Sequence, residues 1–297
     1  NEGSSAAIQR GLLRRRGCTA DEDGGGPVGF AHEKSGGGRD EVSRRDQRNA
    51  QLVPVQIRLA AQILDDIIPM IEPGRTTEEI DAEITRMVEA AGAVSATIGY
   101  KGYQHASCIS VNHVVCHGIP AAKVLKDGDI LNVDVTVIVD GWYGDTSRMY
   151  VAGNLSRKAE RLIQVTHDAL MKGIEAAKPG NTFGDIGNAI QAYVEANRMS
   201  VVRDFCGHGL GRVFHAPPNV LHYGRAGTGP VLEEGMFFTI EPMVNLGRPE
   251  TKVLADDWTA VTRDKSLSAQ FEHSVGITAD GADIFTLSPA GKFHPTY

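Results

Sequence analysis

The spacing of hydrophobic residues predicts a chain in which pairs of helices alternate with groups of strands. Apolar residues recur at helical spacing over 56–71 and again over 72–92, where Thr-Thr-Glu-Glu is a helix N-cap signal. A second pair of helices is predicted over 156–178 and 182–198, separated by a Pro-Gly pair that ends the first. Alternating or continuous apolar runs predict strands over 108–119, 129–153, 236–245, 258–264, 268–278 and 282–288.

The order helix, helix, strands occurs twice, which predicts an α/β (α+β) domain of two similar halves. We expect the antiparallel sheets of the two halves to face each other, with the helices on the outside. No sequence repeat accompanies this order, so the duplication is inferred from the order of elements alone. A single catalytic domain is expected over 53–297.

The stretch NVDVTVIVDGWYGDTS, residues 132–147, predicts a β-hairpin with Asp140-Gly141 as its turn. That turn would place Thr136 opposite Asp145. Side chains alternate along a strand, so Asp134 and Asp145 would share one face, about 7–8 Å apart at Cα. Two half-buried carboxylates repel each other unless a cation lies between them. The hairpin alone leaves an alternative open, in which one Asp caps a turn and the other reaches solvent.

Composition separates the first 52 residues from the rest of the chain. Residues 1–52 are rich in Gly, Arg, Asp, Glu and Ser and have no sustained apolar period, which predicts a disordered tail. The cluster Arg14–Arg16 is a candidate targeting or docking element. A solvated extension without function is the simpler interpretation of the same residues.

The overall composition excludes several function classes. The 297 residues are 41% hydrophobic and carry a formal net charge of -7, without a basic stripe among aromatic residues, so no nucleic-acid partner is expected. No apolar run reaches the roughly 18–20 residues of a membrane span and no signal-peptide core is found, so a cytoplasmic protein without a membrane partner is expected. The four cysteines lack zinc-ribbon spacing and are interpreted as reduced thiols.

Candidate metal ligands follow the hairpin along the chain. GHGLGRVFHAPPNV places His208 and His215 in a loop punctuated by Gly and Pro, and Glu241 and Glu272 fall in apolar, strand-like surroundings. Singly, each has an ordinary structural explanation, because loop histidines pack and strand glutamates usually face water. With the two hairpin aspartates they make four carboxylates and one imidazole, the donor complement of a paired divalent-metal site. GHGLG is not interpreted as a phosphate loop, because the P-loop lysine and the flanking strand and helix are missing.

These motifs resemble those of the shorter, bacterial-type (type I) methionine aminopeptidases. The similarity runs from about residue 53 to the C-terminus, in the family's order: SVNHVVCHGIP, NVDVTVIVDGWYGDTS, GHGLGRVFHAPPNVLHYG, EEGMFFTIEP and SLSAQFEHSVGIT. The resemblance implies the pseudo-two-fold pita-bread fold and two divalent metal ions, with Co, Mn, Fe and Zn all suited to the donors. The implied ligands are Asp134, Asp145, His208, Glu241 and Glu272.

The resemblance also implies roles in catalysis and substrate binding. Glu241 would relay a proton from the attacking water to the leaving amine, and His215 would donate a hydrogen bond to the developing oxyanion. His117 would contact the scissile amide. The methionine pocket would be lined by Tyr100, Tyr103, Cys108, Phe214 and Trp258. Aromatic and sulfur groups suit a polarizable thioether. Thr97 replaces a cysteine that is frequent in bacterial relatives, so the pocket rim is expected to differ.

The implied activity is removal of N-terminal methionine from nascent proteins and peptides, preferentially before a small second residue. The expected partners are therefore peptide N-termini that begin with Met, including those near the ribosome, and the expected state is a monomer. The N-terminal segment lacks the Cys and His clusters of the zinc-binding extension in some eukaryotic relatives. Ribosome docking through such a module is therefore not expected.

Three alternatives compete with this interpretation. An Xaa-Pro aminopeptidase of the same fold could share all five ligands but would carry an additional folded N-terminal domain. A non-catalytic binding protein would be expected to have lost ligands. The longer class of methionine aminopeptidases has an insertion before the Glu241 strand, and the 25 residues between His215 and Glu241 leave no room for it.

Overall fold

The computed structural model describes residues 54–295 of the chain. The predicted tail over 1–52 lies outside the described residues, as does the first residue of the expected domain. Within the described range, no helix combines the length and the apolar character that crossing a bilayer requires.

The N-terminal half starts with the two predicted helices. The first ends earlier than expected, at Asp66, and a separate 3₁₀ turn around Pro69 follows, because proline cannot donate the hydrogen bond that a continuing α-helix needs. The second begins at the predicted cap, where Thr76 and Glu79 exchange hydrogen bonds in a capping box. The elements of this half are α3 Pro54–Asp66, η2 Ile68–Met70, α4 Thr77–Ala90, β1 Val94–Ser95, η3 Tyr100–Gly102, β2 Ser107–Val111, β3 Val114–Cys116, β4 Asp129–Val139 and β5 Trp142–Ala152.

The C-terminal half repeats this order. Ser156 caps its first helix and Thr182 its second, at the positions where the sequence predicts these helices to begin. The predicted long strands are divided into shorter ones. The elements are α5 Arg157–Ala176, α6 Phe183–Ala196, β6 Ser200–Val201, β7 Gly207–Gly209, β8 Ala216–Val220, β9 Phe237–Ile240, β10 Met243–Asn245, β11 Thr251–Val253, β12 Ala260–Thr262, β13 Ser268–Gln270, β14 His273–Ile277 and β15 Ala282–Ile284.

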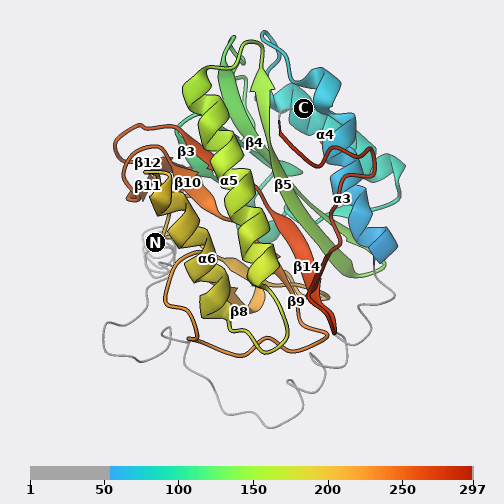
Figure 1. Ribbon diagram of the computed structural model, residues 1–297. Coiled ribbons are helices and arrows are strands. Elements are labelled where there is room, and N and C mark those ends of the chain that lie inside the picture. Colours follow the sequence, from blue (N-terminus) through green and yellow to red (C-terminus); the bar gives the residue numbers. More distant parts are fainter. Residues whose placement is uncertain (1–53, 296–297) are drawn as a thin grey trace, which may run out of the picture.

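Each helix pair packs on its own hydrophobic core. In the first half, side chains such as Ile63, Ile84 and Val135 form a cluster between α3, α4 and the strands β2, β4 and β5. In the second half, α5 and α6 pack on a separate cluster that includes Phe238 and Val275 from strands β9 and β14. Figure 1 shows strands β5 and β14 running between the two helix pairs. All described strand pairs are antiparallel, which confirms the expected α/β class with helices outside.

A buried polar seam joins the two halves where β5 meets the start of β14. The backbone N–H of Glu272 donates to the carbonyl of Ser147 at 3.1 Å, and Thr146 Oγ1 donates to the carbonyl of Glu272 at 2.7 Å. Ser274 Oγ donates to the carbonyl of Asp145 at 2.7 Å. Because these bonds leave few degrees of freedom, the carboxylates of Asp145 and Glu272 are brought to the same place from opposite halves.

Candidate metal centre and pocket

The hairpin that carries the two aspartates has the predicted register. Strands β4 and β5 pair with Thr136 opposite Asp145, and with Asp134 and Asp145 on one face. The turn residues Asp140 and Gly141 have φ values of 52° and 78°, as a two-residue turn of the primed type requires. This local geometry fixes the diagonal placement of the two carboxylates.

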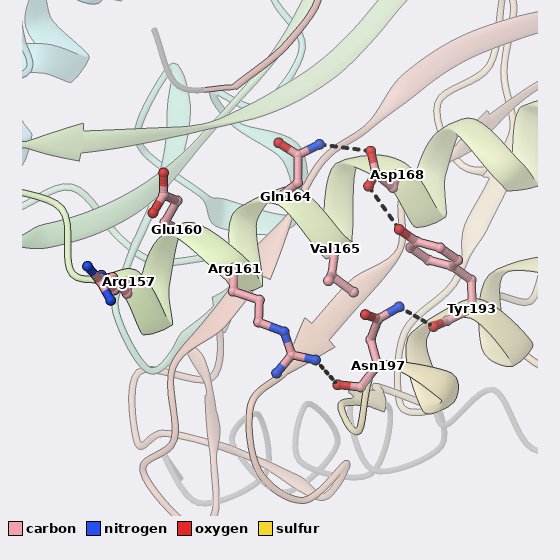
Figure 2. A pocket seen from close by; sticks show the side chains of 8 residues that line it. All are labelled: Arg157, Glu160, Arg161, Gln164, Val165, Asp168, Tyr193 and Asn197. Carbon is pink, nitrogen blue, oxygen red and sulfur yellow. Dashed lines mark hydrogen bonds between the residues drawn. The ribbon is translucent and has the colours of Figure 1, made fainter.

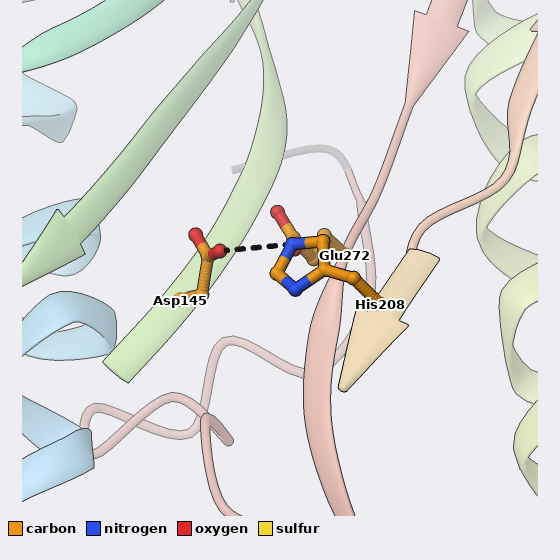
Figure 3. Close-up of side chains that lie close together, drawn as sticks. All are labelled: Asp145, His208 and Glu272. Atoms are coloured by element: carbon orange, nitrogen blue, oxygen red, sulfur yellow. Dashed lines mark ion pairs between the residues drawn. The ribbon is translucent and has the colours of Figure 1, made fainter. Parts of the chain in front are cut away.

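Three of the five expected ligands converge at the seam. One donor atom from each of Asp145, His208 and Glu272 lies within 4.8 Å of the other two, and all three residues are buried (Figure 3). Nε2 of His208 lies 3.6 Å from Oδ2 of Asp145. The cluster therefore draws one carboxylate from the first half and an imidazole and a carboxylate from the second.

The other two expected ligands border this group. Oε1 of Glu241 lies 3.7 Å from Nε2 of His208. Oδ1 of Asp134 is buried and has no hydrogen-bond partner among the described residues. A buried carboxylate oxygen without a donor is costly, so this atom calls for a cation or a proton.

Neighbouring side chains fix the orientation of these carboxylates. Thr136 Oγ1 donates to Oδ1 of Asp145 at 2.7 Å, and Thr239 Oγ1 donates to Oε1 of Glu241 at 2.8 Å. Gln270 Nε2 donates to Oε2 of Glu241 at 3.3 Å. Oδ2 of Asp145 and Oε1 of Glu241 nevertheless lie close to Nε2 of His208, and partners outside the donor set commonly orient metal ligands in this way.

The protonation of the cluster reflects first its burial and then the repulsion among its carboxylates. Burial raises the pKa of Asp145 to about 7, opposed by the hydrogen bond from Thr136. Burial, and then repulsion from Asp145, raise the pKa values of Asp134 and Glu272 well above the ordinary range. Burial lowers the pKa of His208 to about 4, so its imidazole is neutral at pH 7 and able to ligate a metal. A divalent cation would remove the repulsion, and the donor set of carboxylates and neutral imidazole fits such an ion.

Sequence reasoning misplaced three of these residues within their elements. His208 was expected in a loop, but it lies in the short strand β7, where its backbone N–H donates to Thr239 Oγ1 at 3.0 Å. Glu241 and Glu272 were expected inside strands. Instead, Glu241 follows the end of β9, and Glu272 precedes β14 in an isolated bridge. Both glutamates therefore stand at strand breaks, where the backbone can turn their side chains toward the seam.

One fully buried partner of the site was not found from the sequence. The backbone N–H of Glu241 donates to Nε2 of His222 at 3.0 Å, and His222 is 0% exposed. Burial lowers the pKa of His222 to about 3, so it is a neutral acceptor at this strand break. His222 lies two residues after the end of β8, and no periodic signal in the sequence marks it.

Aromatic side chains form one wall beside the cluster. The rings of His215 and His208 are 4.3 Å apart, and Phe214 packs edge-on to Tyr100 at 4.9 Å. Nδ1 of His215 lies 2.9 Å from the Tyr100 hydroxyl. Tyr143, which sequence reasoning did not select, stacks on Phe214 at 5.4 Å.

A second group of expected pocket residues meets around Trp258. Its ring lies 4.9 Å from Tyr103 and 6.3 Å from His117. Burial, and to a lesser extent Lys101, lower the pKa of His117 to about 4, which makes it neutral at pH 7. Cys108 is buried in β2 directly opposite Asp134 on β4. All expected pocket residues thus belong to one of two contacting groups that flank the cluster.

A concave surface on the outside of α5 and α6 differs in character from the cluster. Its polar groups bond to one another: Gln164 and Tyr193 donate to Asp168, and Arg161 donates to the carbonyl of Asn197 (Figure 2). Within residues 54–295 the described metal-ligand group lies at the seam and not in this groove. The groove is a polar helix–helix surface.

Comparison with known proteins agrees with this geometry. Residues 55–279 match the model of metallopeptidase family M24. The chain is 56% identical over 241 residues to a methionine aminopeptidase of Rickettsia prowazekii (strain Madrid E), covering 81% of this chain and 93% of that protein. It is 49% identical over 248 residues to a methionine aminopeptidase of Escherichia coli (strain K12), covering 83% and 94% respectively.

A solved structure shows the same similarity in three dimensions. The crystal structure of methionine aminopeptidase from Rickettsia prowazekii superposes with a TM-score of 0.78 at 54% identity, over 83% of this chain and 98% of that one. The expected pseudo-two-fold fold of facing antiparallel sheets is thereby confirmed.

Proposed function

The chain belongs to metallopeptidase family M24 and is a hydrolase of its methionine aminopeptidase group, and from this premise we propose that it removes N-terminal methionine from nascent proteins and peptides by means of two divalent metal ions. The preferred substrates have a small second residue. The observation that carries the proposal is the convergence of Asp145, His208 and Glu272 within 4.8 Å, in a buried seam that both halves build.

The proposed ligand set extends this group by two carboxylates. Asp134 contributes a buried oxygen without a donor, and Glu241 lies next to the His208 ring. Four carboxylates and one neutral imidazole suit Co(II), Mn(II), Fe(II) or Zn(II), and the donors do not distinguish among them. When bound, the two ions supply Lewis acidity, which polarises the scissile carbonyl and lets water lose a proton near neutral pH.

Glu241 is proposed to move the proton between the attacking water and the leaving amine. Its two oxygens accept hydrogen bonds from Thr239 and Gln270, and His222 holds its backbone N–H. These contacts restrict the rotation of the carboxylate at the edge of the cluster. A general base needs such a fixed position, within hydrogen-bond reach of the proton that it takes.

His215 is proposed to donate a hydrogen bond to the carbonyl oxygen as negative charge develops on it. If the Tyr100 hydroxyl donates to Nδ1 of His215, the imidazole proton resides on Nε2, which then faces substrate as a donor. His117 contacts the scissile amide as a neutral imidazole. Both side chains act without being ligands.

The pocket for the methionine side chain is proposed to lie between the two aromatic groups. Its lining residues are Tyr100, Tyr103, Cys108, Phe214 and Trp258. Phe214 and Trp258 supply apolar faces, and a thiol and aromatic ring edges make favourable contacts with a thioether. Selection of methionine follows from this lining together with binding of the free α-amine at the metal centre.

The setting of the reaction is part of the same proposal. The partners are peptide N-termini that begin with methionine, both near the ribosome and elsewhere in the cytoplasm. The protein acts as a monomer and needs neither nucleic acid nor a membrane. The free thiols of Cys108 and Cys116 are consistent with a reducing compartment.

Three peptides and a chelator test the proposed activity. Met-Ala-Ser should be cleaved, Met-Lys-Ser much more slowly, and Ala-Pro-Ser, an Xaa-Pro substrate, not at all. Removal of metal should abolish cleavage, and Co(II) or Mn(II) should restore it. Cleavage that persists in verified metal-free protein, or a preference for Ala-Pro-Ser, would show that the proposal is wrong.

A further inference from the structure

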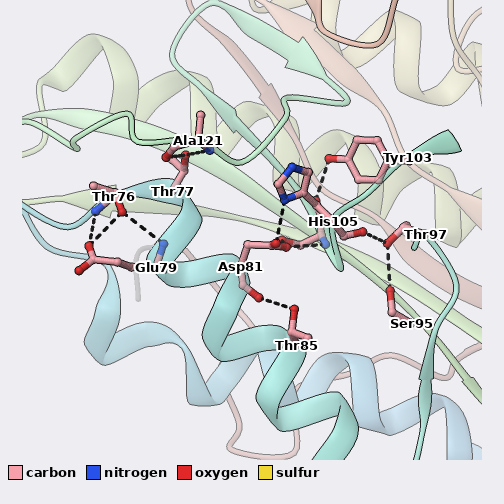
Figure 4. A network of polar contacts seen from close by, with 11 residues as sticks. Thr76, Thr77, Glu79, Asp81, Thr85, Ser95, Thr97, Tyr103, His105 and Ala121 are labelled. Carbon is pink, nitrogen blue, oxygen red and sulfur yellow. Dashed lines mark hydrogen bonds and ion pairs between the residues drawn. The ribbon is translucent and has the colours of Figure 1, made fainter. Parts of the chain in front are cut away.

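Helix α4 carries a buried aspartate that lies outside the metal cluster. Asp81 is 7% exposed, and its carboxylate is directed to the chain segment between β1 and β2. Oδ1 accepts hydrogen bonds from the backbone N of Ser107 at 2.9 Å and from its Oγ at 2.7 Å. Oδ2 lies 3.1 Å from Nδ1 of His105 (Figure 4). A buried carboxylate with three polar partners holds its surroundings firmly.

The partners of Asp81 connect directly to the pocket. The hydroxyl of Tyr103 donates to the carbonyl of Ser107 at 2.9 Å, so the residue that Asp81 holds also anchors this phenol. The Tyr103 ring lies 5.7 Å from His105 and 4.9 Å from Trp258. Cys108 is the next residue along the chain. Asp81 therefore fixes Ser107, the residue that anchors the Tyr103 hydroxyl and directly precedes Cys108. Tyr103 and Cys108 both belong to the proposed methionine pocket.

The segment that these bonds hold has little regular structure of its own. Gly99, Lys101 and Gly102 have φ values of 83°, 50° and 87°, so the backbone turns repeatedly in the left-handed region. A further hydrogen bond holds the same segment: Thr97 Oγ1 donates to the carbonyl of His105 at 2.7 Å. Because few ladder bonds order this segment, its side-chain bonds to neighbouring elements set the position of the pocket wall.

We propose that Asp81 is a positioning residue for side-chain recognition: through Ser107 and His105 it holds Tyr103, and thereby sets the selectivity for methionine over other apolar side chains. The inference rests on the proposed function. Asp81 touches neither substrate nor metal. Discrimination between similar apolar side chains amounts to about 10–200-fold in hydrophobic pockets, so a loosened wall should remove a measurable part of it.

Asp81→Ala tests the inference most directly. We expect its KM for Met-Ala-Ser to rise about tenfold with kcat within about twofold, because the wall contributes binding in ground state and transition state alike. The preference for Met-Ala-Ser over Leu-Ala-Ser should fall by a similar factor, while metal content remains that of the parent protein.

Asp185→Ala is the matched control. Asp185 also accepts three hydrogen bonds, two from Thr182 and one from the N–H of Gly227, and neither of these partners belongs to the proposed pocket. A loss of selectivity in Asp81→Ala that Asp185→Ala reproduces would be a general effect of lost stability, and the inference would be wrong.

Two further measurements do not depend on turnover. Amide hydrogen exchange at Ser107 should accelerate in Asp81→Ala but not in Asp185→Ala, and binding of free L-methionine to the metal-loaded protein should weaken about tenfold. If Asp81→Ala does not fold, Ser107→Ala replaces it and should give smaller changes in the same direction, since the Ser107 N–H keeps its bond to Asp81.

The outcomes separate the two proposals. If the parent protein fails to cleave Met-Ala-Ser, the proposed function is wrong, and the L-methionine titration then decides on Asp81. Unchanged KM, selectivity and L-methionine affinity in a folded variant overturn the inference and leave the proposed function intact. A fall in kcat together with metal content would mean that Asp81 acts through the metal centre, which also contradicts it.

Discussion

At the scale of single residues, the contact between His215 and Tyr100 distinguishes a proposed oxyanion donor from the proposed ligands. His215 has a φ of 57°, which glycine adopts without strain, so His215→Gly removes the imidazole and leaves the backbone unstrained. We expect it to retain both metals and to lose about 10²–10³-fold in kcat, the usual effect of deleting an oxyanion donor. Anaerobic metal titration followed by Met-Ala-Ser turnover at saturating metal measures both quantities.

His208→Ala provides the contrast, because His208 lies inside the cluster. It should lose metal and turnover together. Should His215→Gly lose metal as well, or recover full turnover when metal is added, the role assigned to His215 would be contradicted.

The buried titratable groups predict an unusual stability profile for metal-free protein. A carboxyl such as Asp145, with a folded pKa of about 7 against an ordinary 3.8, contributes stability that is present below 3.8 and lost as pH rises through 7. His208, with a folded pKa of about 4 against 6.5, contributes stability that is present above 6.5 and lost as pH falls toward 4. His222 acts in the same direction as His208.

Chelated protein should therefore become more stable between pH 8 and pH 6.5, and less stable again below pH 6.5. Added metal displaces the carboxyl protons, so the rise in Tm on adding Mn(II) should be larger at pH 8 than at pH 6.5. Calorimetry across this range, with and without metal, checks both statements. A Tm of chelated protein that increases steadily from pH 6.5 to pH 8 would refute the protonation assigned to Asp145.

Which residues the sequence could identify depended on how local their partners are. The pairing of Thr136 with Asp145 was predictable because a two-residue turn fixes the register of a hairpin. Gln270 and His222 were not, since each meets Glu241 only through contacts between segments distant in sequence. The roles proposed for His117 and Trp258 rest on family resemblance alone, because nothing in the hydrophobic pattern distinguishes these two residues.

At the scale of elements, we expect the turn of the β4–β5 hairpin to tolerate backbone strain without a change in metal affinity. Gly141 has a φ of 78°, and an added Cβ would lie 3.0 Å from Arg212 Nη1, the end of a flexible side chain. We expect Gly141→Ala to cost about 1–2 kcal/mol through backbone strain alone. For a domain of this size that lowers Tm by roughly 2–8 °C. Metal affinity should not change, because the ladder and not the turn holds the aspartates.

Gly180→Ala is the matched control for this variant. Gly180 has a φ of 86° with open space around it, and it lies between α5 and α6. The two variants should show similar thermal shifts in calorimetry and the same metal affinity. Weaker metal binding in Gly141→Ala only would mean that the turn itself sets the carboxylate geometry.

Elements were predicted well where one signal defined them and less well where two signals conflicted. The caps Thr76 and Thr182 marked helix starts, because each belongs to a capping box that supplies hydrogen-bond partners at the first turn. The breaks after Ile240 and before His273 were missed, since the apolar run continues through them while the backbone leaves the ladder. Residues at the seam are buried whether or not their backbone pairs with a neighbouring strand. The sequence therefore stays apolar through the break and does not reveal it.

At the scale of the whole molecule, a buried ion pair with its hydrogen bonds holds the C-terminal segment against both the helices and the sheet of the first half. Asp65 of α3 accepts hydrogen bonds from Arg148 of β5, from Ser288 Oγ and from the N–H of Ala290. Arg148 is 2% exposed. Asp65→Ala should destabilise the protein by about 3–5 kcal/mol, because it removes one partner of a buried ion pair.

Asp65→Leu combined with Arg148→Met is the compensating control, since it removes both charges and retains the volume. It should restore most of the lost stability in urea unfolding. If the double variant is as unstable as Asp65→Ala, packing of the C-terminal segment and not charge burial accounts for the loss.

The seam between the halves also determines when during its own synthesis the protein can become active. The chain is made from the N-terminus, so the half with Asp134 and Asp145 leaves the ribosome first, and Glu272 follows 127 residues after Asp145. Until β14 emerges, Asp145 lacks both the neighbouring carboxylate of Glu272 and the hydrogen bond that Ser274 Oγ donates to its carbonyl. A growing chain therefore lacks one of the five proposed ligands until Glu272 has emerged, and hydrolytic capacity cannot precede the synthesis of β14.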